Sequence, residues 1–514
     1  MSAYSGQAQN ATPELDPFAP VPLTQSKPAN FDKLPPPPKP RNALSAIVFA
    51  PPASAAGKTG FDSTNARKKK AARKPGQPAQ AGAPEQLGSK PAAPTSSYAM
   101  APATTPPLDI GPIRKPLKRR PRPDEDPYAQ IGLRSGAFDI FPAVELIGGY
   151  SSNPGQTPDA HGAGLFSVQP ELRVRSLWTR HDFKADLRGA YTWFSPDQTP
   201  GLNRPSFDGK ASGRIDIHDS LNADLNARTL VSTDSPASPN LQAGLARLPI
   251  FATFGGGGGL TKSFNRLELT AKGDVERTVY QDSLLTDGTY ASNSDRQYNQ
   301  YSGGFRAAYE TLPGVKPFVE TSLDTRRHDL AVDNFGYQRD SRGITVKGGS
   351  TFDLRGTLTG EFAVGYSQRD YVEPRFDKLA GLIGNASLVW TVDALTTVKF
   401  TSSSTIGESA AAGVPGAFYR DAGVQIDHAF RRWLIGTLKF GLGQDRYIDA
   451  VQSASGSPLG DRIDNRYSAG AGLTYKLDRT VQVKGEFRQD WLRSNVSGVD
   501  YTASTFLVGL RLQR

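Results

Sequence analysis

The sequence predicts an all-β protein in which residues 138–514 form a transmembrane antiparallel β-barrel of about 18 strands, with a range of roughly 16 to 20. Three observations predict this fold class. Apolar and polar residues alternate along many segments, the connections between these segments are short and long in turn, and no apolar run reaches the length of about 18 residues that a membrane helix needs. Residues 1–137 have a different composition and are predicted to be a disordered region rich in Pro, Ala and Lys.

The N-terminal region holds the excess charge of the chain. The formal net charge is +10, and this whole excess lies in residues 1–137, so residues 138–514 are neutral overall. Proline is also concentrated there, as in the run from Pro35 to Pro40, and aromatic residues are few. Little apolar surface is therefore available to offset the entropy of folding. We expect an extended, semi-rigid periplasmic arm.

Two clusters of basic residues in the arm are candidate polyanion-binding sites, because such clusters attract anionic polymers. Peptidoglycan or an anionic polysaccharide would suit this chemistry, and a solvated linker without a partner is the alternative. Nucleic acid is not expected as a partner, since the clusters lack interleaved aromatic residues that stack on bases. The candidates are Arg67, Lys68, Lys69, Lys70, Arg73, Lys74, Arg114, Lys115, Lys118, Arg119, Arg120 and Arg122.

The residues after Met1 show no clear secretory signal peptide, because they lack an apolar core of the required length. The nearest candidate is internal, at residues 43–56, and Pro51 and Pro52 interrupt it. Two explanations stay open: export by an atypical signal, or a different start of translation.

Alternation with a period of two is the main signal in the second region. In residues 183–193, for example, apolar side chains at odd positions alternate with Lys184, Asp186 and Arg188. Successive side chains of a strand point to opposite faces, so each such strand has one apolar and one charged face. The same pattern recurs in residues 266–276 and 481–491.

The connections alternate without exception between short turns and longer polar loops. A soluble sandwich gives no reason for this asymmetry, whereas an outer-membrane barrel has short periplasmic turns and long extracellular loops. The short turns lie at residues 179–181, 218–220, 263–265, 312–314, 353–355, 393–395, 430–432 and 478–479. The long loops lie at residues 151–160, 195–206, 232–246, 282–296, 329–341, 372–378, 408–416, 448–462 and 494–499. One segment, residues 251–261, contains five consecutive glycines and is predicted as either a kinked strand or a loop.

Aromatic residues near the strand ends are predicted to form two girdles at the lipid interfaces. The girdle near the short turns would contain Trp178, Phe264, Tyr309, Phe352, Trp390, Trp433 and Tyr475. The girdle near the long loops would contain Tyr150, Trp193, Tyr280, Tyr371, Tyr419, Tyr447, Trp491 and Tyr501.

The charged faces of the strands are predicted to line a water-filled lumen, because a barrel of this size is wide enough to enclose a channel. Two interpretations of these charges stay open: a transverse field that orients polar solutes, or ion pairs that only hold the hydrated wall together. The lumen-lining candidates are Lys184, Asp186, Arg188, Lys210, Arg214, Asp216, Arg266, Glu268, Lys272, Asp274, Lys484, Glu486, Arg488 and Asp490.

Catalysis, cofactors and bound metals are not expected. The chain has no cysteine and only five histidines, which are spread along it without metal-ligand spacing or convergence on one serine. The sequence Gly57-Lys58-Thr59 resembles the end of a phosphate-binding loop, but Pro52 occupies the position of the first glycine. We therefore predict no enzyme.

The start of the second region resembles that of a family of proteobacterial outer-membrane proteins, the putative β-barrel porin 2 family. The residues that carry the resemblance are Asp126, Pro127, Tyr128, Gly132, Leu133, Arg134, Gly136, Phe138, Pro142, Glu145, Tyr150 and Asn153. The resemblance covers residues 126–514 and supplies no catalytic residues. Similar proteins carry proline-rich N-terminal extensions and have been associated with surface-polysaccharide production, so the resemblance implies a link to that process. One departure concerns the last strand, which ends in Gln513 and Arg514 instead of an aromatic residue.

These observations favour a porin-like passive channel for small polar solutes in the outer membrane of a Gram-negative bacterium. Outer-membrane lipid and the barrel-assembly machinery are the expected partners, and the oligomeric state stays open. The alternative hypothesis is a barrel linked to surface-polysaccharide export or to cell-wall attachment through its basic arm.

Overall fold

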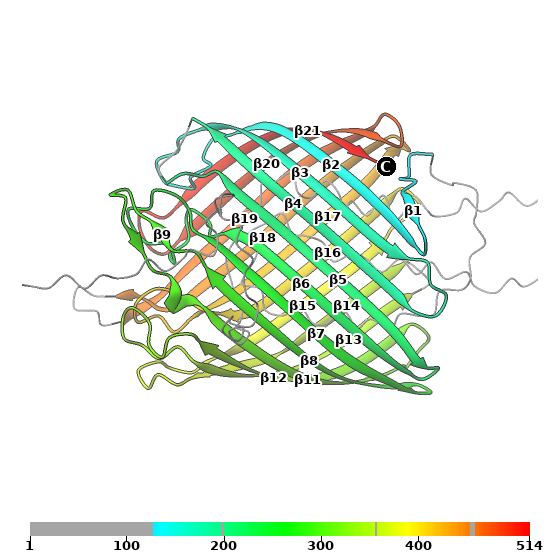
Figure 1. The fold of residues 1–514 in the computed structure, drawn as a ribbon, viewed down its shortest axis with the longest axis horizontal. Coiled ribbons are helices and arrows are strands. Elements are labelled where there is room, and N and C mark those ends of the chain that lie inside the picture. The colour runs from blue at the N-terminus through cyan, green and yellow to red at the C-terminus, as the bar shows by residue number, and fades with distance from the viewer. Residues whose placement is uncertain (1–126, 197–199, 355–356, 453–457) are drawn as a thin grey trace, which may run out of the picture.

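The computed structural model describes residues 127–196, 200–354, 357–452 and 458–514. Eighteen long antiparallel strands of these residues form a closed wall, and they are strongly tilted, as Figure 1 shows. The predicted fold class is thus confirmed. No helix among the described residues has the length and hydropathy needed to cross a membrane.

The wall contains every long strand of the described chain, in sequence order. Its strands are β2 (Phe138–Ser151), β3 (Ala163–Ser176), β4 (Asp182–Ser195), β5 (Arg204–His218), β6 (Leu221–Thr233), β7 (Ile250–Phe264), β8 (Leu267–Tyr280), β11 (Tyr298–Tyr309), β12 (Val315–His328), β13 (Ser341–Leu354), β14 (Leu358–Tyr371), β15 (Leu379–Thr391), β16 (Thr396–Gly407), β17 (Ala417–Arg431), β18 (Leu434–Gln452), β19 (Pro458–Lys476), β20 (Val481–Ser494) and β21 (Tyr501–Gln513). Three short elements lie between β8 and β11: β9 (Ser283–Leu284), β10 (Tyr290–Ala291) and the 3-10 helix η3 (Ser294–Arg296). A short strand, β1 (Leu133–Ser135), forms a hairpin with β2.

The barrel closes where β2 pairs with β21, the first and last strands of the wall. Their register runs from Ala143 opposite Gln513 to Ser151 opposite Thr505. Closure removes the free edges that an open sheet would expose to lipid, where unpaired backbone groups are costly. Side-chain exposure alternates along β21, as expected for a strand with lipid on one side and the barrel interior on the other. Phe506 is 57% exposed, while its neighbour Leu507 is only 5% exposed.

The predicted connections fall between wall strands, with one difference. Residues 448–462 are predicted as a long loop, but β18 continues to Gln452 and β19 begins at Pro458. Tyr447 still lies opposite Arg462, and Val451 lies opposite Gly460. Beyond the membrane a ladder needs no apolar face, so the hydropathy pattern does not reveal this extension.

The glycine-rich segment is a strand and not a loop. Residues 251–261 belong to β7 and pair without interruption with both β6 and β8. Gly257 shows why small residues are needed here, since a Cβ atom at this position would lie 2.1 Å from Oδ1 of Asp274. The absence of a side chain on β7 leaves room for the charged side chain of β8.

The predicted girdle near the long loops is wrong for several residues. Tyr150 and Trp193 are exposed on the outer face, but Tyr419, Tyr447 and Tyr501 are at most 4% exposed. Tyr280 is also buried. These four tyrosines occur at inward-facing strand positions and pack beneath the loops, so position near a strand end alone did not identify the lipid face. In contrast, Trp178, Phe264, Tyr309, Trp390, Trp433 and Tyr475 near the short turns are exposed.

We predict that Val508→Arg, near the middle of the outer face of β21, destabilises the barrel by about 2–4 kcal/mol in phospholipid vesicles, because it places a charge in hydrocarbon. Val508 is 64% exposed on this face. The matched control is Thr502→Arg on the same face near the strand end, where the expected loss is about 0–1 kcal/mol. Urea unfolding, followed by heat-dependent gel migration, measures both. Equal losses would show that this face does not meet a lipid bilayer.

Candidate functional site

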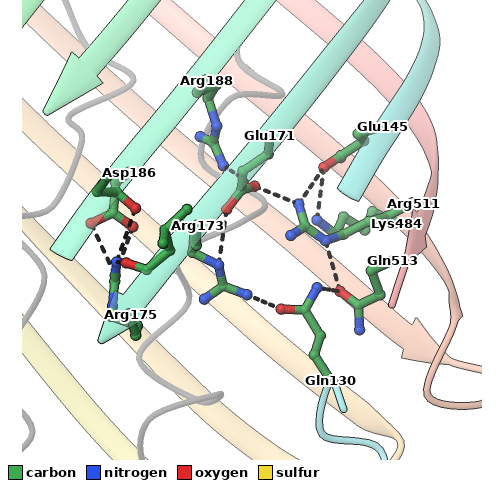
Figure 2. A network of polar contacts seen from close by, with 12 residues as sticks. Gln130, Glu145, Glu171, Arg173, Arg175, Asp186, Arg188, Lys484, Arg511 and Gln513 are labelled. Carbon is green, nitrogen blue, oxygen red and sulfur yellow. Dashed lines mark hydrogen bonds and ion pairs between the residues drawn. The ribbon is translucent and has the colours of Figure 1, made fainter. Parts of the chain in front are cut away.

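The candidate functional site is the inner wall of the barrel together with the loops that fold into its mouth. Five charged side chains from five strands form a continuous chain of contacts across the closure of the barrel: Lys484 on β20, Arg511 on β21, Glu145 on β2, Glu171 on β3 and Arg188 on β4. We call this set the closure relay. Figure 2 shows it with the neighbouring polar residues on the inner face.

The distances in the closure relay are those of ion pairs. Glu145 Oε2 lies 3.0 Å from Lys484 Nζ and 3.6 Å from Arg511 Nη1. Glu171 Oε2 lies 2.8 Å from Arg511 Nη1 and 2.9 Å from Arg188 Nη2. The side chains are between 4% and 13% exposed, so each charge has left bulk water and depends on its partners.

Gly509 makes the closure relay possible. It lies on β21 between Lys484 of β20 and Ile147 of β2 in the two ladders. A Cβ atom on Gly509 would lie 3.1 Å from Oε1 of Glu145. The glycine therefore leaves the space through which Glu145 and Lys484 meet across the intervening strand.

The relay continues toward the short-turn end of the barrel. Arg173 lies 3.4 Å from Glu171 and donates to the side-chain oxygen of Gln130. Gln130 in turn donates to Oε1 of Gln513 at 2.8 Å, and Arg511 donates to the same oxygen at 2.9 Å. The last residues of the barrel are therefore tied to the segment that precedes β1 (Figure 2).

Ion pairs also line the opposite part of the wall. Glu320 on β12 lies 2.7 Å from Lys272 on β8 and 3.6 Å from Lys347 on β13. Arg306 on β11 lies 3.6 Å from Glu320 and 2.7 Å from Glu361 on β14. Glu320 with Lys347 and Arg306 with Glu320 join neighbouring strands. Lys272 with Glu320 and Arg306 with Glu361 reach across intervening strands, so they bridge the wall as well as neutralise its charges.

The structure brings most of the predicted lumen residues into ion pairs. The pairs are Lys184 with Asp182, Asp186 with Arg175, Arg188 with Glu171, Lys210 with Asp208, Arg214 with Asp216, Glu268 with Lys316, Lys272 with Glu320, Lys484 with Glu145, Glu486 with Lys439 and Arg488 with Asp490. Asp274 accepts a hydrogen bond from Asn226 at 3.5 Å. Arg266 lies in the turn between β7 and β8 and is exposed at the rim rather than in the wall.

Sequence reasoning missed Glu145, Glu171 and Arg511, although each alternates with apolar neighbours in the way that identified the other candidates. The signal was present in β2, β3 and β21 but was not used for site prediction. The predicted polyanion-binding residues, from Arg67 to Arg122, lie outside the described residues, and their role stays a prediction.

The mouth at the long-loop end is bridged by loops from opposite sides of the wall. Asn240, in the loop between β6 and β7, accepts hydrogen bonds through Oδ1 from the Ser409 hydroxyl at 3.2 Å and the Ala410 backbone N–H at 3.0 Å. These last two residues lie between β16 and β17. Eight wall strands separate the two loops in one direction and ten in the other. The contact therefore spans the barrel.

A third loop clamps this bridge through Arg339, between β12 and β13. Its buried guanidinium donates to the carbonyl oxygens of Val414 and Ala411, both at 3.0 Å, and to that of Ser409. Its Nε also donates to Asp333 in its own loop. Removing this one side chain would take a hydrogen-bond donor away from three carbonyl groups of the bridge, of which that of Ala411 would keep the Val414 backbone N–H.

Apolar packing supports the bridge from within. Val414, Ala417, Tyr419, Tyr447, Leu492, Tyr501 and Ala503 form a buried cluster, which we call the mouth cluster. A second cluster contains Ile147, Ala163, Leu165, Phe194, Leu202, Leu248 and Leu507. Both combine inward-facing strand residues with loop residues. The loops thus narrow the lumen at the long-loop end, while the charged wall continues below them.

Glu408 connects the bridge to the wall. Its carboxylate pairs with Arg326 of β12, whose side chain is fully buried and which also donates to Gln300 Oε1 at 2.9 Å. Burial raises the pKa of Glu408, but the positive charge of Arg326, with smaller contributions from His328 and Arg369, outweighs it and holds the pKa below the ordinary carboxyl range. The carboxylate therefore stays charged at neutral pH.

The family model described as putative beta-barrel porin 2 matches residues 126–514. This match covers the barrel and the segment directly before it. No curated protein matches the chain.

Solved structures with similarity to the chain include proteins of three organisms. OpdK of Pseudomonas aeruginosa is 13% identical, with 73% of this chain and 99% of that chain covered and a TM-score of 0.35. OccAB4 of Acinetobacter baumannii is 10% identical, with coverages of 73% and 98% and a TM-score of 0.36. The FrpB iron transporter of Neisseria meningitidis is 10% identical, with coverages of 69% and 62% and a TM-score of 0.38.

We predict that Arg511→Ala destabilises the barrel by about 3–5 kcal/mol, because it leaves the buried carboxylates of the closure relay without a shared partner. The control is Arg493→Ala, since Arg493 is 50% exposed and lies 3.9 Å from its partner Asp500. An exposed pair of this kind contributes only about 0–1 kcal/mol. Urea unfolding in vesicles measures both variants, and equal stabilities would contradict the role of the relay.

We predict that acid loosens the bridge at Glu408. The pKa of Glu408 is lowered in the folded state, so its carboxylate stabilises the folded bridge fully above the ordinary carboxyl pKa. This stabilisation is lost as the pH falls through the lowered pKa. The protection factors of the backbone amides in residues 408–416 against hydrogen exchange, corrected for the intrinsic pH dependence of exchange, should therefore fall in acid, and Glu408→Gln should show low protection already at neutral pH. A variant that exchanges like the unmodified protein at neutral pH would contradict this.

Proposed function

The chain belongs to the putative beta-barrel porin 2 family, and we propose that it is a passive channel for small polar solutes in the outer membrane of a Gram-negative bacterium. One observation carries the proposal: a closed wall with a continuous charged inner face. Charged side chains can face inward only where the lumen is hydrated, and a hydrated lumen admits polar solutes. Porins are channels rather than enzymes, and the proposal assigns no catalytic residue.

The pairing of the inner charges supports weak ion selectivity. Residues 138–514 are neutral overall, and most of the inner charges lie within ion-pair distance of an opposite charge. Such a wall presents hydrogen-bond donors and acceptors alternately along the lumen. It does not create an electrostatic field of a single sign. Of the two interpretations of these charges, this arrangement favours the hydrated wall held by ion pairs.

The loops at the mouth would set the size limit of the channel. The bridge between Asn240 and Ser409, clamped by Arg339, crosses the lumen where a solute from outside would enter. Solute passage would then depend on spaces beside the bridge or on its transient release. Below the bridge, the charged wall would provide a hydrated lumen for a solute that has passed the bridge.

The partners of the barrel are also part of the proposal. Outer-membrane lipid would contact the exposed apolar face, for example Val508 and Leu512 of β21. The barrel-assembly machinery would recognise this last strand, in which Gln513 accepts from Arg511 and the Arg514 backbone N–H donates to the Pro142 carbonyl at 3.1 Å.

We predict that the purified full-length protein produces discrete conductance steps in planar lipid bilayers. Arg339→Ala should increase the step size or the open time, because it releases the carbonyl groups that hold the bridge. The matched control is Lys378→Ala, an exposed residue of another long loop. Silence of both the unmodified protein and Arg339→Ala at every voltage would contradict a channel.

A further inference from the structure

The ladder between β15 and β16 is interrupted. It extends only from Ala386 opposite Ser402 to Thr391 opposite Thr397, six pairs in all. This is the shortest ladder among those that the described residues form in the wall. The two strands nevertheless continue to the long-loop end, β15 paired with β14 and β16 paired with β17. A free edge therefore exists on residues 379–385 and on residues 403–407.

We call this unpaired stretch between residues 379–385 and residues 403–407 the seam. Here the outer side of β16 and β17 overlaps the inner side of β14 and β15. Phe418 and Ile406 lie opposite each other in the ladder of β16 and β17. Phe418 occurs between Ala417 and Tyr419, which both belong to the inward-facing mouth cluster, so Phe418 lies on the outer face of β17. It is nevertheless only 5% exposed.

The residues that cover Phe418 come from the inner face of β14 and β15. Phe418 and Ile406 form a cluster with Leu379 and the partly buried Tyr371. Leu379 lies opposite Arg369, whose side chain bonds the inner-face residue Asp324. The outer side of β16 and β17 thus packs against the inner side of β14 and β15.

Gly381 allows this overlap to be tight. A Cβ atom at this position would lie 2.9 Å from Cε1 of Phe418, so the phenylalanine ring rests directly on the backbone of β15. The wall is sealed here by side-chain contacts and not by backbone hydrogen bonds. Such contacts have no fixed direction and can be replaced by those of another apolar chain.

A polar crevice lies on the lumen side of the seam. Its lining includes Asn385, Thr405, Ile406, Arg326 and Arg369. Asn385 Oδ1, Thr405 Oγ1 and Arg369 Nε are buried without hydrogen-bond partners, although Arg369 and Thr405 are only 5% and 3% exposed. Arg326 donates to the Ile406 carbonyl on the free edge at 3.1 Å. The crevice therefore offers unused hydrogen-bond donors and acceptors next to the packed apolar side chains of the seam.

We propose that the seam between β15 and β16 is a lateral passage between the lumen and the outer leaflet, which takes a single-chain amphiphile. Its hydrocarbon chain would lie against Phe418, Ile406 and Leu379, and its polar head would bind in the crevice. Free strand edges at membrane depth are tolerated where they are buried in protein or line a cavity, and this seam meets that condition on its inner side. This activity goes beyond the axial passage of polar solutes.

Cysteine pairs test the open edge directly, because the chain has no cysteine of its own. Continued register would place Asn385 opposite Ser403, and Ser387 lies opposite Thr401 in the closed part of the same ladder. In outer-membrane vesicles, the control pair Ser387→Cys with Thr401→Cys should oxidise readily to a disulfide. The pair Asn385→Cys with Ser403→Cys should oxidise much more slowly. Equal rates would overturn the proposal, because they would show a closed ladder.

Transfer of a fluorescent fatty acid, 11-(dansylamino)undecanoic acid, tests the passage in proteoliposomes of the full chain. Joining Asn385→Cys to Ser403→Cys with a bifunctional thiol reagent after folding should lower the protein-dependent transfer several-fold and leave KCl conductance unchanged. Phe418→Ala should raise the transfer several-fold, whereas Phe440→Ala on the exposed outer face of β18 should not.

The outcomes separate the two proposals. Undiminished transfer after joining the edges overturns the lateral passage, whatever the conductance. Loss of transfer together with unchanged conductance supports both functions. Transfer that depends on the seam in a protein without any conductance would contradict the channel and support the lateral passage.

Discussion

The structure depends on one constraint: within hydrocarbon, each backbone N–H and C=O group needs a partner from the protein itself. A sheet satisfies this only when its first strand meets its last, so β2 must pair with β21 although they lie at opposite ends of the described chain. The closure relay reinforces this junction with buried charges from both strands and their neighbours. Closure also fixes the direction of every side chain, because inside and outside become distinct along each strand.

The strands set the outer dimensions of the lumen, while the loops determine what can enter it. The contact between Asn240 and Ser409 joins residues 169 positions apart in sequence, and Arg339 adds a third loop to it. Buried polar contacts of this kind are rigid only while all partners are present. The arrangement of the mouth therefore depends on a few buried polar side chains, because the loss of one of them removes several contacts between loops at once.

The sequence predicted the wall well because period-two alternation and turn length are local signals. Lys184, Asp186 and Arg188 could be assigned to the inner face without any knowledge of their partners. Contacts between distant segments, such as that of Asn240 with Ser409, leave no local signal. Tyr419 was misplaced for a different reason: its nearness to a strand end was taken as the signal, although alternation along β17 places it on the inner face with Ala417.

The seam between β15 and β16 is the place where the closure constraint is relaxed, and its position explains how this can be stable. The free edges lie where β16 and β17 overlap the inner side of β14 and β15, so that apolar side chains cover the region instead of a ladder. A ladder resists sliding because each hydrogen bond has a fixed register, whereas packed side chains can separate and close again. A barrel closed by backbone ladders around most of its wall and by packed side chains at one seam can keep its polar lumen intact while the strands at that seam separate.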